Sequence, residues 1–345
     1  MSRKDTYEST PTGSSTSYSA VEAPLSGHSI LSKRVSRRLS ALTLALVPIL
    51  PTAQHIEATH SYYQEATQDV EGTIGYISQT LEALNYGTYY FETDQHCSLS
   101  DAYLSKKIVN ELKPAAVFLG GDLTNSGWRA EGLCAYTLLD GMDETIEKHA
   151  VLGNHDTAKH TAKQYKKYGV NVLTVGSLTT MKNGVTLYGA TDPTLTQLGH
   201  TKTRLRDPSI TREIFTDIVT RDIEALGPDI ALLHNPWYAK ETNPPIIIGG
   251  HFHSESHERL EDTIYFIGDD VAAKKVGKSA IWNTHVGTSS RYIFVFDKDD
   301  PADIIGFTKI SIVNADGKPN VEYAPITYFG SEVQADPDPQ VPIGR

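Results

Sequence analysis

The chain has 345 residues, of which 39% are hydrophobic, and its formal net charge at pH 7 is -11. A chain of this length and composition can bury a large core, so we expect one main folded domain with an appended segment. Nucleic-acid binding without sequence preference needs Lys and Arg to neutralise phosphates, so the acidic excess argues against a nucleic-acid-binding surface.

The first 54 residues differ in composition from the rest. Residues 1–32 are rich in Ser, Thr, Gly and Pro and lack apolar periodicity, which predicts a disordered segment. Residues 33–54 join the basic stretch Lys33–Arg38 to the apolar run Leu39–Leu50 and then to Pro51-Thr52-Ala53, which is the form of an export signal. The run is shorter than the roughly 20 apolar residues that a membrane-spanning helix needs.

Two export interpretations of residues 33–54 remain open, a cleaved signal and an uncleaved signal anchor. Two adjacent arginines also fit the twin-arginine form of such a signal. The alternative without export is a buried amphipathic helix of the domain. Because a basic flank stays on the cytoplasmic side, both export interpretations predict an extracytoplasmic domain. The uncleaved form also predicts membrane contact through the N-terminal segment.

Residues 55–87 predict a helical lead-in to the main domain. Four apolar residues recur there at helical spacing, namely Ile74, Ile77, Leu81 and Leu84. Gly87 breaks the pattern. We assign residues 88–329 to the main domain and residues 330–345, rich in Pro and Asp, to a flexible tail.

The main domain alternates short β runs with helical stretches such as Asp101–Leu112 and Trp128–Leu139, which predicts an α/β fold. Further β candidates follow without long helices between them, and we expect them to form a second, largely antiparallel sheet region. They are Val185–Tyr188, Ile264–Ile267, Tyr292–Phe296 and Ile310–Val313. The expected architecture is two stacked mixed β-sheets flanked by helices.

Five short apolar runs in the domain each lead to residues that can bind metal. These endings are Asp94-Gln95-His96, Gly121-Asp122, Gly153-Asn154-His155-Asp156, His234-Asn235 and Gly250-His251-Phe252-His253. In an α/β sheet, ligands gather in the loops beyond the carboxyl ends of the strands. Five such endings therefore predict one preassembled site for two metal ions.

The spacing of these residues suits shared binding. Asp94 and His96 alternate along an extended segment, as do His251 and His253, so each pair would present its side chains on one face. The carboxylate of Asp122 has two oxygens and could bridge two cations.

The third motif combines a hard ligand with a free imidazole. Asn154 offers a neutral oxygen ligand, and the adjacent His155 would point differently and remain free to act on a substrate. His234 ends a Leu-rich run, and taken alone it fits a core histidine equally well.

In this order, the five motifs resemble the calcineurin-like metallophosphoesterase superfamily over roughly Tyr89–Val313. The chain is most similar to its exported or membrane-anchored bacterial members, judged from Cys97 and Cys134 beside the motifs and from Gly189-Ala190-Thr191-Asp192-Pro193. The resemblance implies a four-layer α/β/β/α sandwich. It also implies hydrolysis of phosphomonoesters or phosphodiesters by attack of a metal-bridging hydroxide.

The resemblance also implies roles for individual residues. One divalent ion would be held by Asp94, His96, Asp122 and His253. The other would be held by Asp122, Asn154, His234 and His251. His155 would face the substrate, and Asp156 would orient His155. Ligands of these types accept Mn, Fe, Zn or Co. The alternative is a non-catalytic metal-binding relative that acts as a ligand- or partner-binding module, and such a chain should have lost ligands.

One position departs from the pattern of the family. Many relatives have Asp three residues after the bridging Asp, and purple acid phosphatases have a Tyr ligand there, whereas this chain has Asn125. Because Asn supplies no phenolate, the resemblance does not extend to a purple Fe(III) centre.

The chain has two cysteines, and both lie near the first two motifs. Cys97 directly follows the first motif and Cys134 lies just beyond the second, so the loops that carry them should converge. In an exported protein this arrangement favours a disulfide that braces the metal loops. The alternative is a pair of unlinked buried thiols.

Overall fold

The computed structural model describes residues 53–196, 203–271, 288–315 and 318–329. The predicted disordered segment, residues 33–52 of the predicted export signal and the predicted tail lie outside the described residues. The chain divides into two compact units, Met1–Ile56 and Glu57–Arg345. Of the first unit, only residues 53–56 are described.

Within the described residues, eight strands form a first mixed sheet, in the order β15-β14-β13-β1-β2-β3-β4, with β16 paired to β14. Their bounds are β1 Tyr86–Glu92, β2 Ala116–Leu119, β3 Glu147–Ala150, β4 Asn171–Val172, β13 Thr288–Asp297, β14 Asp300–Ala315, β15 Lys318–Tyr323 and β16 Thr327–Tyr328. Strands β1 to β4 are parallel neighbours. Strands β13 to β15 extend the sheet antiparallel from β1.

A second sheet of six described strands has the order β11-β12-β10-β9-β6-β5. Their bounds are β5 Leu178–Thr180, β6 Thr186–Ala190, β9 Ile230–Leu233, β10 Ile246–Gly249, β11 Ser256–Leu260 and β12 Thr263–Ile267. The four central strands are parallel, and the edge strands β5 and β11 are antiparallel to their neighbours. A separate short ribbon pairs β7, Thr194–Leu195, with β8, Arg204–Leu205.

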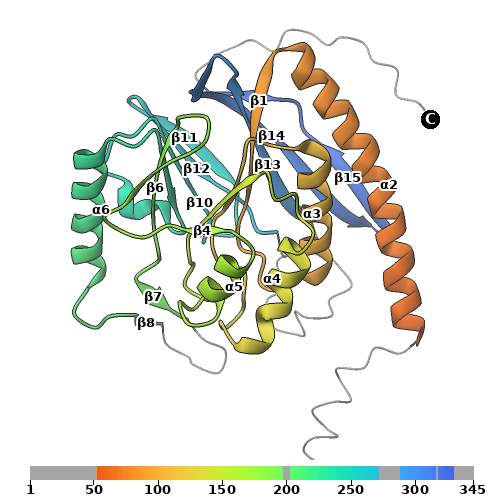
Figure 1. Ribbon diagram of the computed structural model, residues 1–345, viewed down its shortest axis with the longest axis horizontal. Helices are drawn as coiled ribbons and strands as arrows, with labels where there is room; N and C mark the ends of the chain where they lie inside the picture. The colour runs from red at the N-terminus through yellow and green to blue at the C-terminus, as the bar shows by residue number, and fades with distance from the viewer. Residues whose placement is uncertain (1–52, 197–202, 272–287, 316–317, 330–345) are drawn as a thin grey trace, which may run out of the picture. The chain divides into compact units, whose positions relative to one another are not determined.

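Helices cover the outer faces of both sheets. They are α2 Ala53–Ala83, α3 Leu99–Leu112, α4 Gly132–Leu139, α5 Thr161–Lys167, α6 Arg212–Leu226 and the 3-10 helices η1 Arg129–Glu131 and η2 Pro236–Ala239. Side chains of α2 to α5 pack with the first sheet, and side chains of α6 pack with the second. In Figure 1, α6 accordingly lies on one side of the sheets and α2 and α3 on the other.

Alternation along the strands builds the layers. In β1, Tyr89 and Phe91 belong to the apolar cluster between the two sheets, whereas Tyr90 belongs to the cluster under the helices. In β9, Leu232 faces the other sheet and Ala231 packs with α6. Both faces of the central strands are therefore buried, as is typical of parallel strands in α/β folds. These layers confirm the predicted pair of stacked mixed sheets flanked by helices.

The predicted helical periodicity before the domain lies in α2. Val70, Ile74, Ile77 and Leu81 are buried against the first sheet and its other helices. Leu84, which the periodicity also included, follows the end of α2 and is exposed. In the part of the chain that the structure describes, no helix is long and apolar enough to cross a membrane.

The expectation of a second, largely antiparallel sheet region is wrong. β13 and β14 do pair antiparallel, but they extend the first sheet. β6 and β12 instead lie parallel to β9 and β10 in the second sheet. The physical reason is connectivity: α6 carries the chain from β6 to β9 as a crossover, and the β11–β12 hairpin returns the chain parallel to β10.

A buried ionic contact fastens α3 to β13. The guanidinium of Arg291, on β13, is fully buried. Its Nη2 donates to Oδ1 of Asp101 at 2.9 Å, its Nη1 donates to Ser289 at 2.6 Å, and its Nε donates to Ser105 at 3.0 Å. Asp101 and Ser105 belong to α3, the helix that follows the first predicted metal motif. Each donor group of Arg291 therefore has a partner, which a buried charge requires.

We predict that Arg291→Met destabilises the fold, because it leaves the buried carboxylate of Asp101 without its counter-charge. The free energy of unfolding, measured by urea denaturation, should fall by about 3–5 kcal/mol. Lys107→Met is the matched control, because Lys107 forms an ion pair with Glu71 at 3.3 Å near the surface. That variant should lose about 1 kcal/mol or less. Equal losses in the two variants would contradict the prediction.

Candidate metal centre

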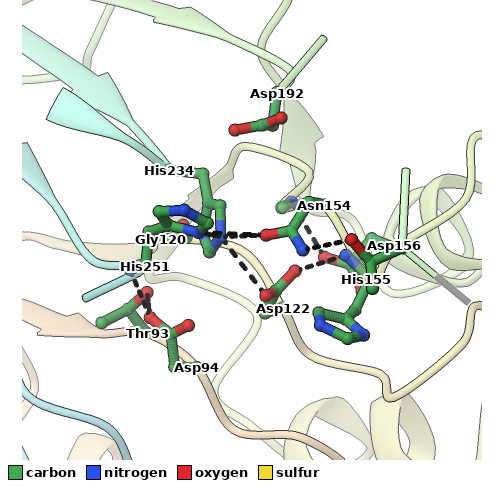
Figure 2. Close-up of polar contacts among 12 residues, drawn as sticks. Thr93, Asp94, Gly120, Asp122, Asn154, His155, Asp156, Asp192, His234 and His251 are labelled. Atoms are coloured by element: carbon green, nitrogen blue, oxygen red, sulfur yellow. Dashed lines mark hydrogen bonds and ion pairs between the residues drawn. The ribbon is translucent and has the colours of Figure 1, made fainter. Parts of the chain in front are cut away.

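The predicted ligands come from the carboxyl ends of strands in both sheets. Those from the first sheet are Asp94 and His96 after β1, Asp122 after β2, and Asn154 after β3. His155, which we expect to face the substrate, directly follows Asn154. Those from the second sheet are His234 after β9 and His251 and His253 after β10. Figure 2 shows the side chains of Asp122, Asn154, His234 and His251 turned toward one another.

Asp94, His96 and His253 form a first group of candidate ligands. Each offers one ligand atom, and these atoms lie within 4.8 Å of one another. Oδ1 of Asp94 is 3.7 Å from Nε2 of His96 and 3.5 Å from Nε2 of His253. Oδ2 of Asp94 accepts hydrogen bonds from the Thr93 hydroxyl at 2.7 Å and from the backbone N–H of His251 at 2.9 Å. The carboxylate is thereby fixed with Oδ1 toward the two imidazoles.

Asp122, Asn154, His234 and His251 form a second group. Nε2 of His234 lies 3.3 Å from Oδ2 of Asp122 and 3.0 Å from Oδ1 of Asn154. Nδ1 of His251 lies 3.1 Å from the same amide oxygen and 3.2 Å from Nε2 of His234. Nδ1 of His234 is 2.9 Å from the carbonyl of Gly120, which leaves Nε2 as the nitrogen that faces the group.

Both groups have features that fit a bound cation. Bonds of about 2.0–2.2 Å from a metal to its ligands place neighbouring donor atoms about 2.8–3.6 Å apart. The four distances within the second group, 3.0 to 3.3 Å, lie in this range. In the first group, Oδ1 of Asp94 and both ring nitrogens of His96 are buried without a hydrogen-bond partner among the described residues. Buried polar atoms are rarely left unpaired, so divalent cations fit the residues present.

The charges of the site favour the same conclusion. Burial lowers the pKa of His96 to about 4, so the ring is neutral at pH 7, which is the form that binds metal. Burial alone would raise the pKa of Asp122 and lower that of His234, but the attraction between them reverses both shifts. The buried carboxylate of Asp122 therefore needs a positive charge beside it. A cation would supply this charge in place of the proton on His234.

The backbone at the ligands is strained. Among the described residues, nine other than glycine have a positive φ. Five of these are predicted ligands, namely Asp94, His96, Asp122, His251 and His253. Such conformations cost about 1–3 kcal/mol each and tend to cluster at functional sites. Gly121, with φ +100°, allows the β2 loop to approach Gly153 and the His234 ring, where a Cβ would lie 2.6 and 2.8 Å from their atoms.

His155 lies beside both groups. Its imidazole is within 4.8 Å of ligand atoms of His96 and Asp122. Its Nδ1 is 2.7 Å from the backbone carbonyl of Asn125, so this hydrogen bond orients the ring and leaves Nε2 available. The contact that orients His155 is therefore the carbonyl of Asn125.

The role expected for Asp156 is different in the structure. Its carboxylate does not serve as the partner of the His155 ring; it accepts hydrogen bonds from the backbone N–H and hydroxyl of Thr124, at 3.1 and 2.8 Å, and from the N–H of Gly153 at 3.2 Å. Burial and then the charge of Asp122 raise the pKa of Asp156 to about 6. Asp156 thus ties the β2 loop to the β3 loop, because both loops offer it backbone donors.

Asn125 fits its position because its side-chain amide can donate a hydrogen bond. Its Nδ2 donates to the carbonyl of His96 at 2.7 Å, and its backbone N–H donates to Oε1 of Glu131 at 2.8 Å. A carboxylate here would face the carbonyl of His96 without a proton to share. The departure from the family pattern is therefore matched by a contact that needs an amide.

Sequence reasoning missed two residues that orient ligands. Thr196 accepts a hydrogen bond from Nδ2 of Asn154 at 3.1 Å, which turns Oδ1 of that amide toward the imidazoles. Buried Asp270 places its Oδ2 3.0 Å from Nδ1 of His253, so Nε2 of His253 faces Asp94. Asp270 follows β12 just as the motifs follow their strands, which was a usable signal. Nothing in the sequence around Thr196 distinguished it.

A disulfide joins Cys97 to Cys134, which confirms the predicted bridge over the unlinked thiols. The two Cα atoms are 5.1 Å apart. Cys97 directly follows His96, and Cys134 lies in α4. The bridge therefore ties the first ligand loop to a helix of the outer layer.

A search of curated proteins found no match to this chain. Among solved structures, TT1561 of Thermus thermophilus is 14% identical, over 62% of this chain and 95% of its own, with a TM-score of 0.42. A novel archaeal phosphodiesterase is 12% identical, over 65% of this chain and 99% of its own, with a TM-score of 0.37. Vacuolar protein sorting 29 from Cryptosporidium parvum is 11% identical, over 71% of this chain and 99% of its own, with a TM-score of 0.34.

The comparison with protein families gives a match that coincides with the site. Residues 90–255 match the family described as calcineurin-like phosphoesterase. This segment begins in β1 and includes both groups of candidate ligands as well as His155. Residues 90–255, which are just under half of the chain, therefore carry the match to the calcineurin-like phosphoesterase family.

Proposed function

We propose that the chain is a binuclear metal-dependent phosphoesterase that hydrolyses phosphomonoester or phosphodiester bonds. The observation that carries the proposal is the convergence of two groups of candidate ligands at Asp122, with the imidazole of His155 beside them. The family match supports a hydrolase of phosphoesters. Nitrogen and oxygen ligands of this kind suit Mn, Fe, Zn or Co.

In the proposed site, one ion would be held by Asp94, His96, Asp122 and His253, and the other by Asp122, Asn154, His234 and His251. When bound, the ions would supply Lewis acidity toward the phosphoryl oxygens and lower the pKa of a water nucleophile. Thr93, Thr196 and Asp270 would hold the ligand side chains in place through their hydrogen bonds.

His155 is the residue that we assign to the substrate. Its Nδ1 is engaged by the carbonyl of Asn125, so Nε2 is the atom that can reach a substrate oxygen. In its protonated form, the imidazole can donate a hydrogen bond to a phosphoryl oxygen or a proton to the leaving oxygen. The backbone N–H of the same residue donates to Oδ1 of Asp122 at 2.7 Å, which links the placement of His155 to the shared carboxylate.

The competing interpretation is a non-catalytic relative that keeps the fold and binds a ligand or a partner protein. Such a relative would be free to lose ligands. Here each expected ligand type is present, and the ligands lie together in two groups. A metal-dependent hydrolase of another ester class is also compatible with these residues, and substrate assays separate it from a phosphoesterase.

We predict that hydrolysis of an aryl phosphate or its diester needs Mn²⁺ or a similar ion and depends on His155. His155→Ala should lower kcat by about 10²–10⁴-fold, because it removes the proton donor. Its metal content, measured by mass spectrometry, should stay the same, whereas Asp122→Asn should lose both metal and activity. His257→Ala, an exposed histidine on β11, is the control and should keep both. The proposal is wrong if no metal supports hydrolysis and the wild type is as inactive as His155→Ala.

A second prediction concerns Asp270 and metal affinity. Asp270→Asn should weaken metal binding by about 10–100-fold, because it removes the carboxylate that fixes the orientation of His253. The affinity can be measured by competition with a metal-binding dye, so the result does not depend on catalysis. The affinity for one ion should fall and the affinity for the other should stay the same, since among the candidate ligands Asp270 contacts only His253 of the first group. Equal loss of both ions, or of neither, would contradict this role.

We also propose that the domain acts outside the cytoplasm. The composition of residues 33–54 supports export, with a cleaved signal or an uncleaved signal anchor both remaining open. The disulfide between Cys97 and Cys134 adds support, because disulfides persist mainly in oxidising compartments.

Export is tested in intact bacterial cells that express the full chain. We expect protease added outside the cells to digest the domain, or the domain to appear in the periplasm or the medium. Deletion of residues 33–54 should keep it inside, and a cytoplasmic marker protein should stay protected throughout. A domain that stays protected with its signal intact, and is absent from the periplasm and the medium, would show that the proposal is wrong.

A further inference from the structure

Two exposed aromatic side chains lie at the edge of the candidate metal centre. Trp237 is 41% exposed and Phe252 is 40% exposed. Phe252 separates His251 from His253 in the chain, and its ring centroid is 5.2 Å from that of His251. Trp237 belongs to η2, three residues after His234, and its ring meets Phe252 edge to face at 6.3 Å. Two loops of the second sheet thus place an aromatic pair beside two candidate ligands.

The exposure of Phe252 alone has a local explanation. His251 and His253 both turn toward the ligand groups, which leaves Phe252 between them exposed at the edge of the site. Trp237 is not flanked by candidate ligands in the chain, and the other three residues of η2 are buried. A polar residue would suit that exposed position, since an indole left in water gains no hydrophobic stabilisation. An indole placed against Phe252 at the edge of the site therefore points to a ligand with an apolar ring.

A positive charge accompanies the pair. Nζ of Lys240 lies 4.2 Å from the centroid of the Trp237 ring, as in a cation–π contact. The ammonium group covers one face of the indole, so a planar ligand would use the other face or the edge. The same charge attracts an anionic ligand to this side of an acidic chain.

The size of the aromatic surface limits what can bind there. Among the described residues, the other exposed large apolar side chains lie outside η2 and the loop after β10; Leu133 and Tyr136, for example, belong to α4. Two side chains offer enough surface for one ring system. A stable protein interface needs about 800 Å² from each partner. A small planar group fits the pair better than a protein surface does.

We infer that Trp237 and Phe252 form a subsite that binds the planar aromatic group of the substrate, an aryl group or a nucleobase carried by the phosphoester. This inference rests on the proposed function, because it takes the phosphoryl group to lie at the two ligand groups. Aromatic side chains bind flat rings by stacking or by edge-to-face contact. A phosphoester with a small alkyl group makes no such contact, so its affinity should not change when the rings of Trp237 and Phe252 are removed.

The test measures binding of non-hydrolysable phosphonates to the full chain loaded with Mn²⁺, by calorimetry. Wild type should bind phenylphosphonate more tightly than methylphosphonate. Trp237→Ala and Phe252→Ala should each weaken the binding of phenylphosphonate about five- to tenfold, which is the lower end of the effect of removing one stacked ring. Both variants should leave methylphosphonate unchanged, and Trp237→Phe should retain most of the affinity. Tyr136→Ala removes an exposed aromatic side chain on α4, away from η2 and the β10 loop, and should change the binding of neither ligand.

A nucleoside phosphonate distinguishes the two sources of the ring. If the variants weaken it more than phenylphosphonate, the subsite fits a nucleobase; if they weaken phenylphosphonate more, it fits an aryl group. The inference is wrong if wild type shows no preference for phenylphosphonate, or if the variants weaken both simple phosphonates equally. Hydrolysis of glycerol phosphate and phenyl phosphate separates the two proposals. If the protein prefers phenylphosphonate but hydrolyses neither ester, only the proposed function is wrong. If it hydrolyses the esters but shows no preference for phenylphosphonate, only the subsite is wrong.

Discussion

The carboxylate of Asp122 is buried where the strand ends of the two sheets meet. Oδ1 accepts a hydrogen bond from the backbone of His155, in the β3 loop, and Oδ2 lies 3.3 Å from His234, at the end of β9 in the other sheet. A buried carboxylate is stable only with donors and a compensating charge beside it. Three loops from two sheets must therefore close on one side chain, and this constraint determines how close their backbones come. The glycines before Asp122 and the left-handed conformations of the ligands follow from that closeness.

The strain at the ligands persists because backbone hydrogen bonds continue past the strands. The N–H of Asp94 donates to the carbonyl of Gly121 at 3.0 Å, and that of His96 donates to the carbonyl of Asp122 at 2.9 Å. In the second sheet, the N–H of Gly250 donates to the carbonyl of His234 at 2.9 Å. The β1 loop is thus paired with the β2 loop, and the β10 loop with the β9 loop, after the regular strands have ended. The apolar layer between the sheets supports the strands from which these loops start.

Local patterns in the sequence identified most of the residues that lie together in the candidate metal centre but not their contacts. Strand ends such as Gly121-Asp122 are recognisable because burial, glycine and a ligand residue lie within a few positions of one another. The bond from His251 to Asp94 joins residues 157 positions apart, and no local pattern reports such a pair. For the same reason, the partners of Asp156 and the role of Thr196 were not predictable. The parallel direction of β6 and β12 depends on connections that the strands themselves do not encode.

The composition of the ligand set also bears on what the site attracts. Among the assigned ligands, only Asp94 and Asp122 are anionic, and the rest are imidazoles and one amide. With two divalent cations, as proposed, the ligands would leave the centre positive. Asp156 and Asp270 also lie beside the ligands, and burial raises the pKa of both carboxyl groups, which reduces the negative charge that they contribute.

The net charge of -11 is spread over the whole chain. It acts weakly at the centre, since salt screens exposed charges beyond about 10 Å. An anionic phosphoester would therefore respond to the local positive charge. A site built mainly from carboxylates would have cancelled that charge and suited Mg²⁺ or Ca²⁺ instead. The predominance of imidazole among the candidate ligands thus links the kind of metal that the site suits to the charge of the substrate that it attracts.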